Sequence, residues 1–284
     1  MAHASIHQLI AGFMSSSNPI WYVYGIVPAS TAMSTLPVGL DETAVALETV
    51  DGIGALVSAL DAEPYGATAM ETNSADLEWL GPRAVAHDLV LTRASDAAAG
   101  AVVPLPMFSL FTSRDAVRAM LGERASQLAS TLQRVSEGRE FALRVYRVDA
   151  ELMESMTALS PRLAELAQSA QAAAAGQRYL LERKLAAEKK SELRVVSQQV
   201  IDEIVSELTR SAVKHVRSAI PRASDADTAA SGTMVLNAAF LVAPGALAEF
   251  QRTLTALVER HDRHGFRFDF TGPWPPYHFV GEER

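Results

Sequence analysis

One long segment of helix-forming residues, 160–218, constrains the fold of this chain more than any other feature. Ser160-Pro161 is a good pair for an N-cap and a first helical turn, and Gly176, after a run of alanines, is the only break that the composition suggests. Beyond Leu193 apolar residues recur every three or four positions, which indicates that one helix face packs against other elements. The second half of the chain is therefore predicted to be built around long helices.

The charge of this segment is concentrated near its middle. Between Glu182 and Glu192 seven of eleven residues are charged, and all four lysines of the chain, of which Lys214 is the last, fall within 160–218. We expect a helix with a positive face, which either is solvated or pairs with an acidic surface of this chain or of a partner. The candidate partner-binding residues on it are Arg178, Arg183, Lys184, Lys189 and Lys190.

The segments around the long helices alternate between strand and helix patterns. We expect strands at 141–148, 234–242 and 266–270, a helix at 246–260 and a small polar linker at 224–231. Strand, long helices, strand, helix, strand is the order of an α+β domain, with helices on one face of a small, mostly antiparallel sheet.

The first half of the chain predicts a sheet of its own. Residues 20–27 are rich in aromatic and β-branched side chains, and Asp51-Gly52 lies between two apolar runs, which is typical of a tight hairpin turn. Three further elements are expected: a helix capped by Ser74 that restarts at Pro82, a strand pair within 102–111, and a helix from the Ser113 cap to Gly138.

Length and pattern together predict an α+β protein of two domains. At 284 residues the chain is long for one compact core, given roughly 150 residues per domain. We place an N-terminal α+β domain at 19–137 and a C-terminal domain at 138–284, after a poorly ordered extension at 1–18. The C-terminal domain contains the helical segment and an extended tail at 271–280.

Charge and composition exclude several classes of protein. Residues 1–100 hold two arginines and eleven acids, a net charge of −9 in a chain whose total is −8, and such a surface repels phosphate backbones and anionic lipid. The absence of cysteine excludes disulfides and thiolate metal sites. No apolar stretch reaches the roughly 18 residues of a membrane span, and the first fifteen residues lack the basic start of a secretory signal. We expect a cytoplasmic protein with no nucleic-acid or membrane partner.

No group of residues forms a catalytic pattern. Gly52-Ile-Gly54 lacks the third glycine of the dinucleotide fingerprint, and the pair His261 and His264 has no third metal ligand nearby. His87-Asp88 are adjacent on a predicted helix and point in different directions. We expect no catalytic residue, cofactor, metal or small-molecule substrate; the alternative is an enzyme of unknown reaction with a site between the domains, near His87 and residues 104–108.

The tail combines prolines with aromatic residues. Pro273, Pro275 and Pro276 lack amide donors, so residues 271–280 are expected to lie extended along a surface. The rings either pin the tail onto its own domain or form a rigid ridge that a partner protein contacts. The candidate partner-binding residues of the tail are Trp274, Tyr277 and Phe279.

This tail carries a family resemblance. Gly272-Pro-Trp-Pro-Pro-Tyr277, followed by Phe279, resembles the terminal signature of the gas vesicle GvpF/GvpL family. Further segments agree in the same order, so that the resemblance covers about residues 20–280: Trp21–Ile26, His87-Asp88, Val103–Phe108, Gly138–Tyr146, Gly176–Leu181 and Met234–Val242.

The resemblance implies a non-enzymatic accessory or minor structural protein of gas vesicles. It implies an N-terminal α+β domain and a C-terminal modified ferredoxin-like domain with long helices. It also implies binding to the hydrophobic shell protein GvpA, a chaperone-like limit on GvpA aggregation, and a role in assembly beside other Gvp accessory proteins, at the gas vesicle and in the cytoplasm. A generic helical scaffold that docks through Glu182–Leu208 is the other alternative.

Overall fold

The structure, a computed structural model, describes residues 19–221 and 232–281. Over these residues the chain divides into two compact units. The first unit comprises residues 19–139 together with 274–281, and the second comprises the described part of 140–273. Each unit has a hydrophobic core of its own.

The first unit is built on a five-stranded sheet. The strands are β1 (Ile20–Pro28), β2 (Ala46–Val50), β3 (Ile53–Leu60), β4 (Val103–Pro104) and β5 (Leu110–Phe111). They follow the order β2-β3-β1-β4, and β5 also pairs with β1. The predicted strand at 20–27 and the predicted hairpin are confirmed, because β2 and β3 pair antiparallel around Asp51 and Gly52, whose φ angles are 48° and 84°.

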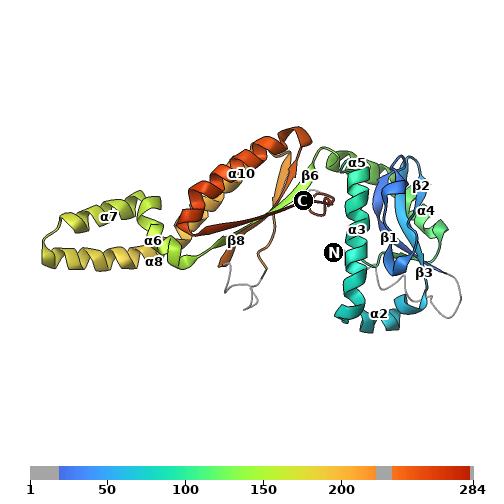
Figure 1. The fold of residues 1–284 in the computed structure, drawn as a ribbon, viewed down its shortest axis with the longest axis horizontal. Coiled ribbons are helices and arrows are strands. Elements are labelled where there is room, and N and C mark those ends of the chain that lie inside the picture. The colour runs from blue at the N-terminus through green and yellow to red at the C-terminus, as the bar shows by residue number, and fades with distance from the viewer. Residues whose placement is uncertain (1–18, 222–231, 282–284) are drawn as a thin grey trace. The chain divides into compact units, whose positions relative to one another are not determined.

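Helices cover both faces of this sheet. They are α2 (Ala67–Asn73), α3 (Leu77–Ala97), α4 (Arg114–Glu123) and α5 (Ala125–Val135). On one face α3 packs Val90, Leu91 and Ala94 against tyrosines of β1, and it runs along the sheet (Figure 1). On the other face α4 and α5 pack against Val23 and Ile26.

Gly25 allows the close approach of β1 and its neighbours. The pairing register of β1 with β3 shifts between Val23 and Gly25, and a Cβ at Gly25 would lie 2.8 Å from the carbonyl oxygen of Val103. A side chain at this position would therefore push β4 and α3 away from the sheet.

Several expectations for the first unit were wrong in detail. The cap of α3 is Asp76, whose carboxylate accepts the amide of Glu78 at 2.9 Å, while Ser74 ends α2. Pro82 lies inside α3 without a restart, because the carbonyl it leaves unbonded, that of Glu78, is at an exposed position and is open to water.

Two other elements of the first unit differ from their predicted form. The segment 102–111 gives β4 and β5, which each pair with β1. Ser113 caps α4 as predicted, but the helix breaks at Arg124, where the backbone leaves the helical region, and α5 follows.

The second unit has a four-stranded sheet with helices on one face. Its elements are β6 (Arg139–Arg147), α6 (Asp149–Leu159), α7 (Pro161–Ala172), α8 (Ala175–Thr209), β7 (Lys214–Arg217), β8 (Thr233–Val242), α10 (Leu247–His261) and β9 (Phe266–Trp274). The strand order is β7-β8-β6-β9. The C-terminal half of α8 and α10 bury their apolar faces against the sheet, and α7 and α8 form an antiparallel pair that extends beyond it (Figure 1).

The long helical segment is shorter and more divided than predicted. Its break lies at Ala173-Ala174, whose backbone is extended, and Gly176 lies inside the first turn of α8. The Arg178 guanidinium donates to the carbonyls of Gln171 and Ala173, both at 3.2 Å, and this satisfies the end of α7.

The end of the segment was also predicted wrongly. The helix stops at Thr209, and Lys214 lies on β7, paired with Leu241 of β8, so that three of the four lysines are on the helix. Pairing with β8 outweighs the helix propensity of residues 213–217, because Val213 and Val216 are β-branched and β8 is available as a partner strand.

The division of the chain differs from the predicted ranges at two places. The first unit ends at Arg139, close to the predicted boundary between 137 and 138. Residues 274–281 belong to the first unit, whereas the predicted range 138–284 placed the tail in the C-terminal domain. The predicted extension at 1–18 and linker at 224–231 lie outside the described residues.

Candidate functional site

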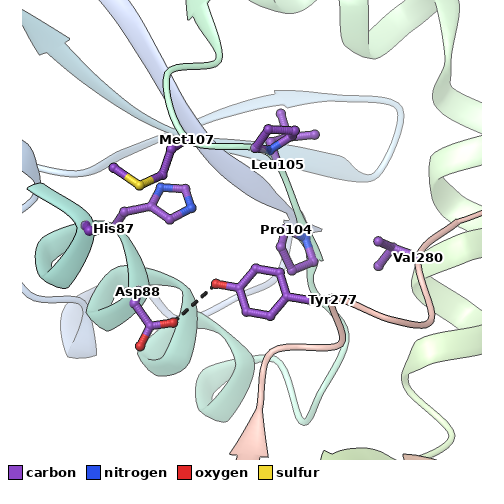
Figure 2. A pocket seen from close by; sticks show the side chains of 9 residues that line it. His87, Asp88, Pro104, Leu105, Met107, Tyr277 and Val280 are labelled. Carbon is purple, nitrogen blue, oxygen red and sulfur yellow. Dashed lines mark hydrogen bonds between the residues drawn. The ribbon is translucent and has the colours of Figure 1, made fainter. Parts of the chain in front are cut away.

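The tail and α3 border a pocket in the first unit. It has a volume of about 480 Å³ and is open to solvent (Figure 2). Its lining consists of Ala84, His87 and Asp88 from α3, Pro104, Leu105, Pro106 and Met107 from the segment after β4, and Tyr277 and Val280 from the tail. The lining is mainly apolar, with Asp88 as its one carboxylate.

Local sequence explains how these elements present the pocket. His87 and Asp88 follow Ala84 by three and four residues, about one helical turn, so although they diverge from each other, both border the face of α3 that carries Ala84. Pro104 and Pro106 keep the following segment extended, and the amide of Leu105 between them donates to the carbonyl of Tyr24 at 3.0 Å. The segment is thus fixed to β1 while its side chains face the cavity.

The tail is held to the first unit by polar and apolar contacts. The Tyr277 hydroxyl donates to Asp88 Oδ1 at 3.2 Å, and Figure 2 shows His87 and Met107 above Asp88 and Val280 to the right of Tyr277. Phe279 is only 4% exposed, and the Arg134 guanidinium donates to the carbonyls of Phe279 and Gly281. The tail therefore forms one wall of the pocket.

His87 is part of a buried hydrogen-bond chain. Tyr22 Oη lies 2.7 Å from His87 Nδ1 and accepts the amide of Phe108 at 3.4 Å, while His87 also bonds the backbone of Leu105. Burial lowers the pKa of His87 to about 4, so the imidazole is neutral at pH 7, and burial also raises the pKa of Tyr22. With its hydrogen bonds already made, His87 holds the 105–108 segment in place.

The residues that line the pocket suit binding of an apolar group better than catalysis. Its lining residues include no serine, threonine, cysteine or lysine, and His87 is engaged by Tyr22 and Leu105. Within residues 19–221 and 232–281 no group of three or more potential ligands could hold a metal ion. An apolar cavity with one acidic edge fits an apolar protein segment that carries a positive or polar group.

The three predicted tail residues differ in how exposed they are. Trp274 and Tyr277 are about two-fifths exposed, and Tyr277 lines the pocket, whereas Phe279 is part of the interior. Of the two alternatives, packing on the predicted C-terminal domain differs from the structure, because the tail lies in the first unit. There Asp88 accepts the Tyr277 hydroxyl and Arg134 donates to the Phe279 carbonyl.

The predicted basic residues all lie on α8 in the second unit. Arg178 caps α7, Lys184 lies 3.9 Å from Glu188, and Lys189 donates to the carbonyl of Met153 at 3.0 Å. Arg183 lies over the ring of Tyr179, and Lys190 is exposed. Four members of this set, Arg178, Arg183, Lys184 and Lys190, are exposed, and Lys189 is half-buried.

The scaffold alternative is limited by burial. Within Glu182–Leu208 the residues Val196, Val200, Ile204 and Leu208 are buried in the core of the second unit. In the C-terminal part of this stretch a partner could therefore contact only the opposite face, where Gln198, Asp202 and Ser206 are exposed.

Sequence reasoning missed a second hollow on α3. A groove of about 330 Å³ lies between α3 and the loop that contains the short helix Leu40–Glu42. Its signal was present in the spacing of Val85 and Leu89, which lie one turn apart and place apolar side chains on the face opposite the buried one.

Comparison with known proteins assigns a family context to this architecture. The family described as gas vesicle synthesis protein GvpL/GvpF matches residues 20–281. Gas vesicle protein L1 of Halobacterium salinarum is 26% identical over 269 residues, covering 91% of this chain and 89% of the relative. Gas vesicle protein F of Streptomyces sp. (strain CB03234) is 27% identical, covering 91% of this chain and 98% of the relative.

A solved structure agrees with the fold. The crystal structure of the gas vesicle protein GvpF from Anabaena sp. PCC7120 superposes with a TM-score of 0.67 at 19% identity, covering 94% of this chain and 98% of that chain. Among the described residues no helix is long and apolar enough to cross a membrane.

Proposed function

The chain belongs to the GvpL/GvpF family of gas vesicle synthesis proteins, and from this premise we propose that it binds the hydrophobic shell protein GvpA, limits its aggregation and supports vesicle assembly. Its place of action is the gas vesicle and the surrounding cytoplasm, and its partners include other Gvp accessory proteins. The role is one of binding, with no catalytic step.

The apolar pocket of the first unit is the observation that carries this proposal. An aggregation-prone partner exposes apolar side chains, and Leu105, Met107 and Val280 offer a preformed surface for one of them. Tyr277 supplies an aromatic side that is still two-fifths exposed. Of the tail residues, Tyr277 and Trp274 are the proposed contacts, and Phe279 anchors the tail beneath them.

The acidic first hundred residues support a solubilising role. Their net charge of −9 repels other copies of a complex and keeps it dispersed at low ionic strength. The buried acid Glu48 is compensated by Arg114 and Arg118, whereas most of the other carboxylates in this region are exposed.

We also propose that the two units are two domains and that the second is a modified ferredoxin-like domain. The second unit has the element order β-α-β-β-α-β when the helices between β6 and β7 are taken as one crossover, and its strand order is β7-β8-β6-β9. This order is that of a ferredoxin-like domain, modified by the inserted α6, α7 and extended α8.

The test is retention of shell protein in solution. Purified chain is mixed with GvpA diluted from denaturant, and light scattering and co-sedimentation are measured. Wild type is expected to suppress scattering. Met107→Gln combined with Tyr277→Ser is expected to weaken binding by roughly thirtyfold, since each loses about 1 kcal/mol of apolar contact.

A matched control separates binding from folding. Val213→Asn combined with Ile220→Asn changes two exposed apolar residues of the second unit and is expected to behave as wild type. If wild type neither suppresses scattering nor co-sediments with GvpA, or if the pocket variant binds as well as wild type, the proposal is wrong.

A further inference from the structure

Helix α3 is apolar on two opposite faces. Its inner face buries Val90, Leu91 and Ala94 against the sheet. Its outer face exposes Val85, at 69%, and Leu89, which follows one turn later. An amphipathic surface helix has one apolar face, whereas the outer face of α3 is a second apolar face that the described residues 19–221 and 232–281 leave exposed.

The outer face borders a groove with an acidic edge. The groove is lined by Pro37, Val38, Pro82, Val85, Ala86 and Leu89, with Asp41 and Glu42 beside them. Arg83 is engaged by Asp41 at 2.5 Å and by the ring of Trp79 at 4.0 Å, so its charge is already balanced. Glu42 and the exposed Glu78, which is two turns before Val85, leave this edge negative.

Further charges lie along the same helix beyond the groove. Asp88 accepts the Tyr277 hydroxyl, and Asp96 lies 3.5 Å from Arg139. Arg93 is exposed one turn after Leu89. With Asp96 balanced by Arg139 and Arg83 by Asp41, Glu78 and Asp88 outnumber Arg93, so α3 keeps a small net negative charge.

The outward face of α8 has the opposite character. Tyr179 and Leu180 are 60% and 64% exposed, and Arg183, Lys190 and Arg194 follow at spacings of four, seven and four residues from Tyr179 onward. Residues at these spacings share one helix face. We name Tyr179, Leu180, Arg183, Ala187, Lys190 and Arg194 the α8 stripe; it contains apolar residues and cations but no carboxylate.

We propose that the α8 stripe of one copy docks into the α3 groove of a second copy of this chain. Glu78 and Leu89 on α3, and Tyr179 and Lys190 on α8, are each eleven positions apart, about 16 Å of helix, so apolar residues and charges have a similar spacing on the two surfaces. Tyr179 and Leu180 meet Val85 and Leu89, and the stripe's cations meet Glu42 and Glu78.

This contact joins different surfaces of the two copies. A head-to-tail contact leaves one groove and one stripe unused at the ends, so further copies add and give either an open chain or a closed ring of several copies. One helix pair of this length buries less than the roughly 1,000 Å² of a stable interface, so the dissociation constant is expected on the order of 10–100 µM. Such assemblies therefore form where the protein is concentrated.

The test uses the purified full chain alone, so it is independent of shell-protein binding. Sedimentation velocity between about 5 and 500 µM measures the average mass. Wild type is expected to exceed twice the monomer mass at the highest concentration in low salt, and to return toward monomer in about 0.5 M salt because the charges are screened.

Two variants are designed, one that disrupts the α3 groove and one that disrupts the α8 stripe. Val85→Asn with Leu89→Asn changes the groove, and Arg183→Gln with Lys190→Gln changes the stripe; all four residues are exposed, so the fold is retained. Each variant alone is expected to stay monomeric. An equimolar mixture is expected to form a dimer and nothing larger, because only one functional groove and one functional stripe can meet.

The docking proposal has one control variant and a set of results that would overturn it. Val213→Asn with Ile220→Asn is expected to associate as wild type does. A wild type that stays monomeric at 500 µM, association that either variant leaves unchanged, or a mixture that forms no dimer would each overturn the proposal. A self-limiting wild-type dimer would overturn the head-to-tail arrangement.

Discussion

The cores of the two units are built from different chemistry. In the first unit the largest buried side chains are Tyr22, Tyr24 and Tyr65, and they hydrogen-bond to His87, Ser58 and Asp41. In the second unit the corresponding side chains are Phe240, Phe250 and Phe266. The second core is held by apolar burial, whereas the first combines burial with a directional polar network.

The polar network explains where the candidate surfaces lie. The Tyr24 hydroxyl accepts the amide of Leu40 at 2.8 Å and so fixes the loop that borders the α3 groove. Tyr22 and His87 fix the 105–108 segment that borders the pocket. In the first unit, buried hydrogen bonds position surface loops, and we expect its response to mutation and pH to differ from that of the second.

The largest effect is expected in the apolar core. Phe250 is fully buried and packs edge-on against Phe240 at 5.3 Å. Phe250→Ala is expected to lower the free energy of unfolding of the second unit by about 3–5 kcal/mol, through lost burial and a cavity. Hydrogen exchange of β8 and α10 amides measures it. Gln251→Ala, at the exposed neighbour, is the control, and a loss below about 1 kcal/mol would contradict the close packing of this core.

Acid is expected to affect the first unit through His87. The folded pKa is about 4 and the unfolded value is about 6.5, so the unfolded chain binds the proton first as the pH falls. The contribution of neutral His87 to the stability of the first unit is therefore fully present above pH 6.5. About 3 kcal/mol of the free energy of unfolding is lost as the pH falls from 6.5 to 4. Exchange of β1 amides as a function of pH measures this loss.

A variant and a second histidine make the acid experiment specific. His87→Gln removes the titration and is expected to flatten the pH dependence of β1 protection. The pKa of His261 in the second unit is also lowered by burial, so the readout has to be resolved by segment. Parallel loss of β1 protection in wild type and variant would show that His87 is not the titrating group.

A smaller effect is expected from one hydroxyl of the polar network. Tyr24→Phe leaves the amide of Leu40 without its partner and is expected to cost about 1–3 kcal/mol in the first unit. Denaturant unfolding followed by exchange of residues 37–43 measures it. Tyr146→Phe, at a half-buried tyrosine of β6, is the control, and an equal cost for both would remove the distinction between the two cores.

The smallest effect is expected at the tail. Tyr277→Phe removes the 3.2 Å bond to Asp88 at a site that is 41% exposed, so the loss of stability is expected to stay below about 1 kcal/mol. Faster exchange confined to the amides of 277–281 is the expected signature. Tyr179→Phe is the control, and a cost as large as that of Tyr24→Phe would place Tyr277 within the polar network.

Local sequence rules predicted the elements where one residue decides the conformation. Asp51-Gly52 adopts the positive φ angles of a tight turn, and Ser113 and Ser160 cap their helices. The rules failed where tertiary contacts decide. Pro82 continues a helix because Glu78 can bond water, and the break at Ala173-Ala174 depends on a cap that comes from Arg178.

The candidate site was only partly predictable for the same reason. Periodicity shows that Val85 and Leu89 share a face with Glu78, but it does not show which face of α3 the sheet covers. The prolines of the tail predicted an extended backbone, and the rings of Tyr277 and Phe279 predicted that the tail packs against a surface. Only the fold shows that Asp88 and Arg134, far away in sequence, hold the tail.

The return of the tail makes the first unit discontinuous in sequence. The 134 residues of the second unit stand between Arg139 and the last wall of the pocket. At roughly 5–20 residues per second a ribosome needs about 7–27 s to synthesise them. During that interval the nascent first unit lacks Tyr277 and Phe279, so its pocket is completed only after the second unit has been synthesised, and a chain terminated within the second unit has an open apolar surface.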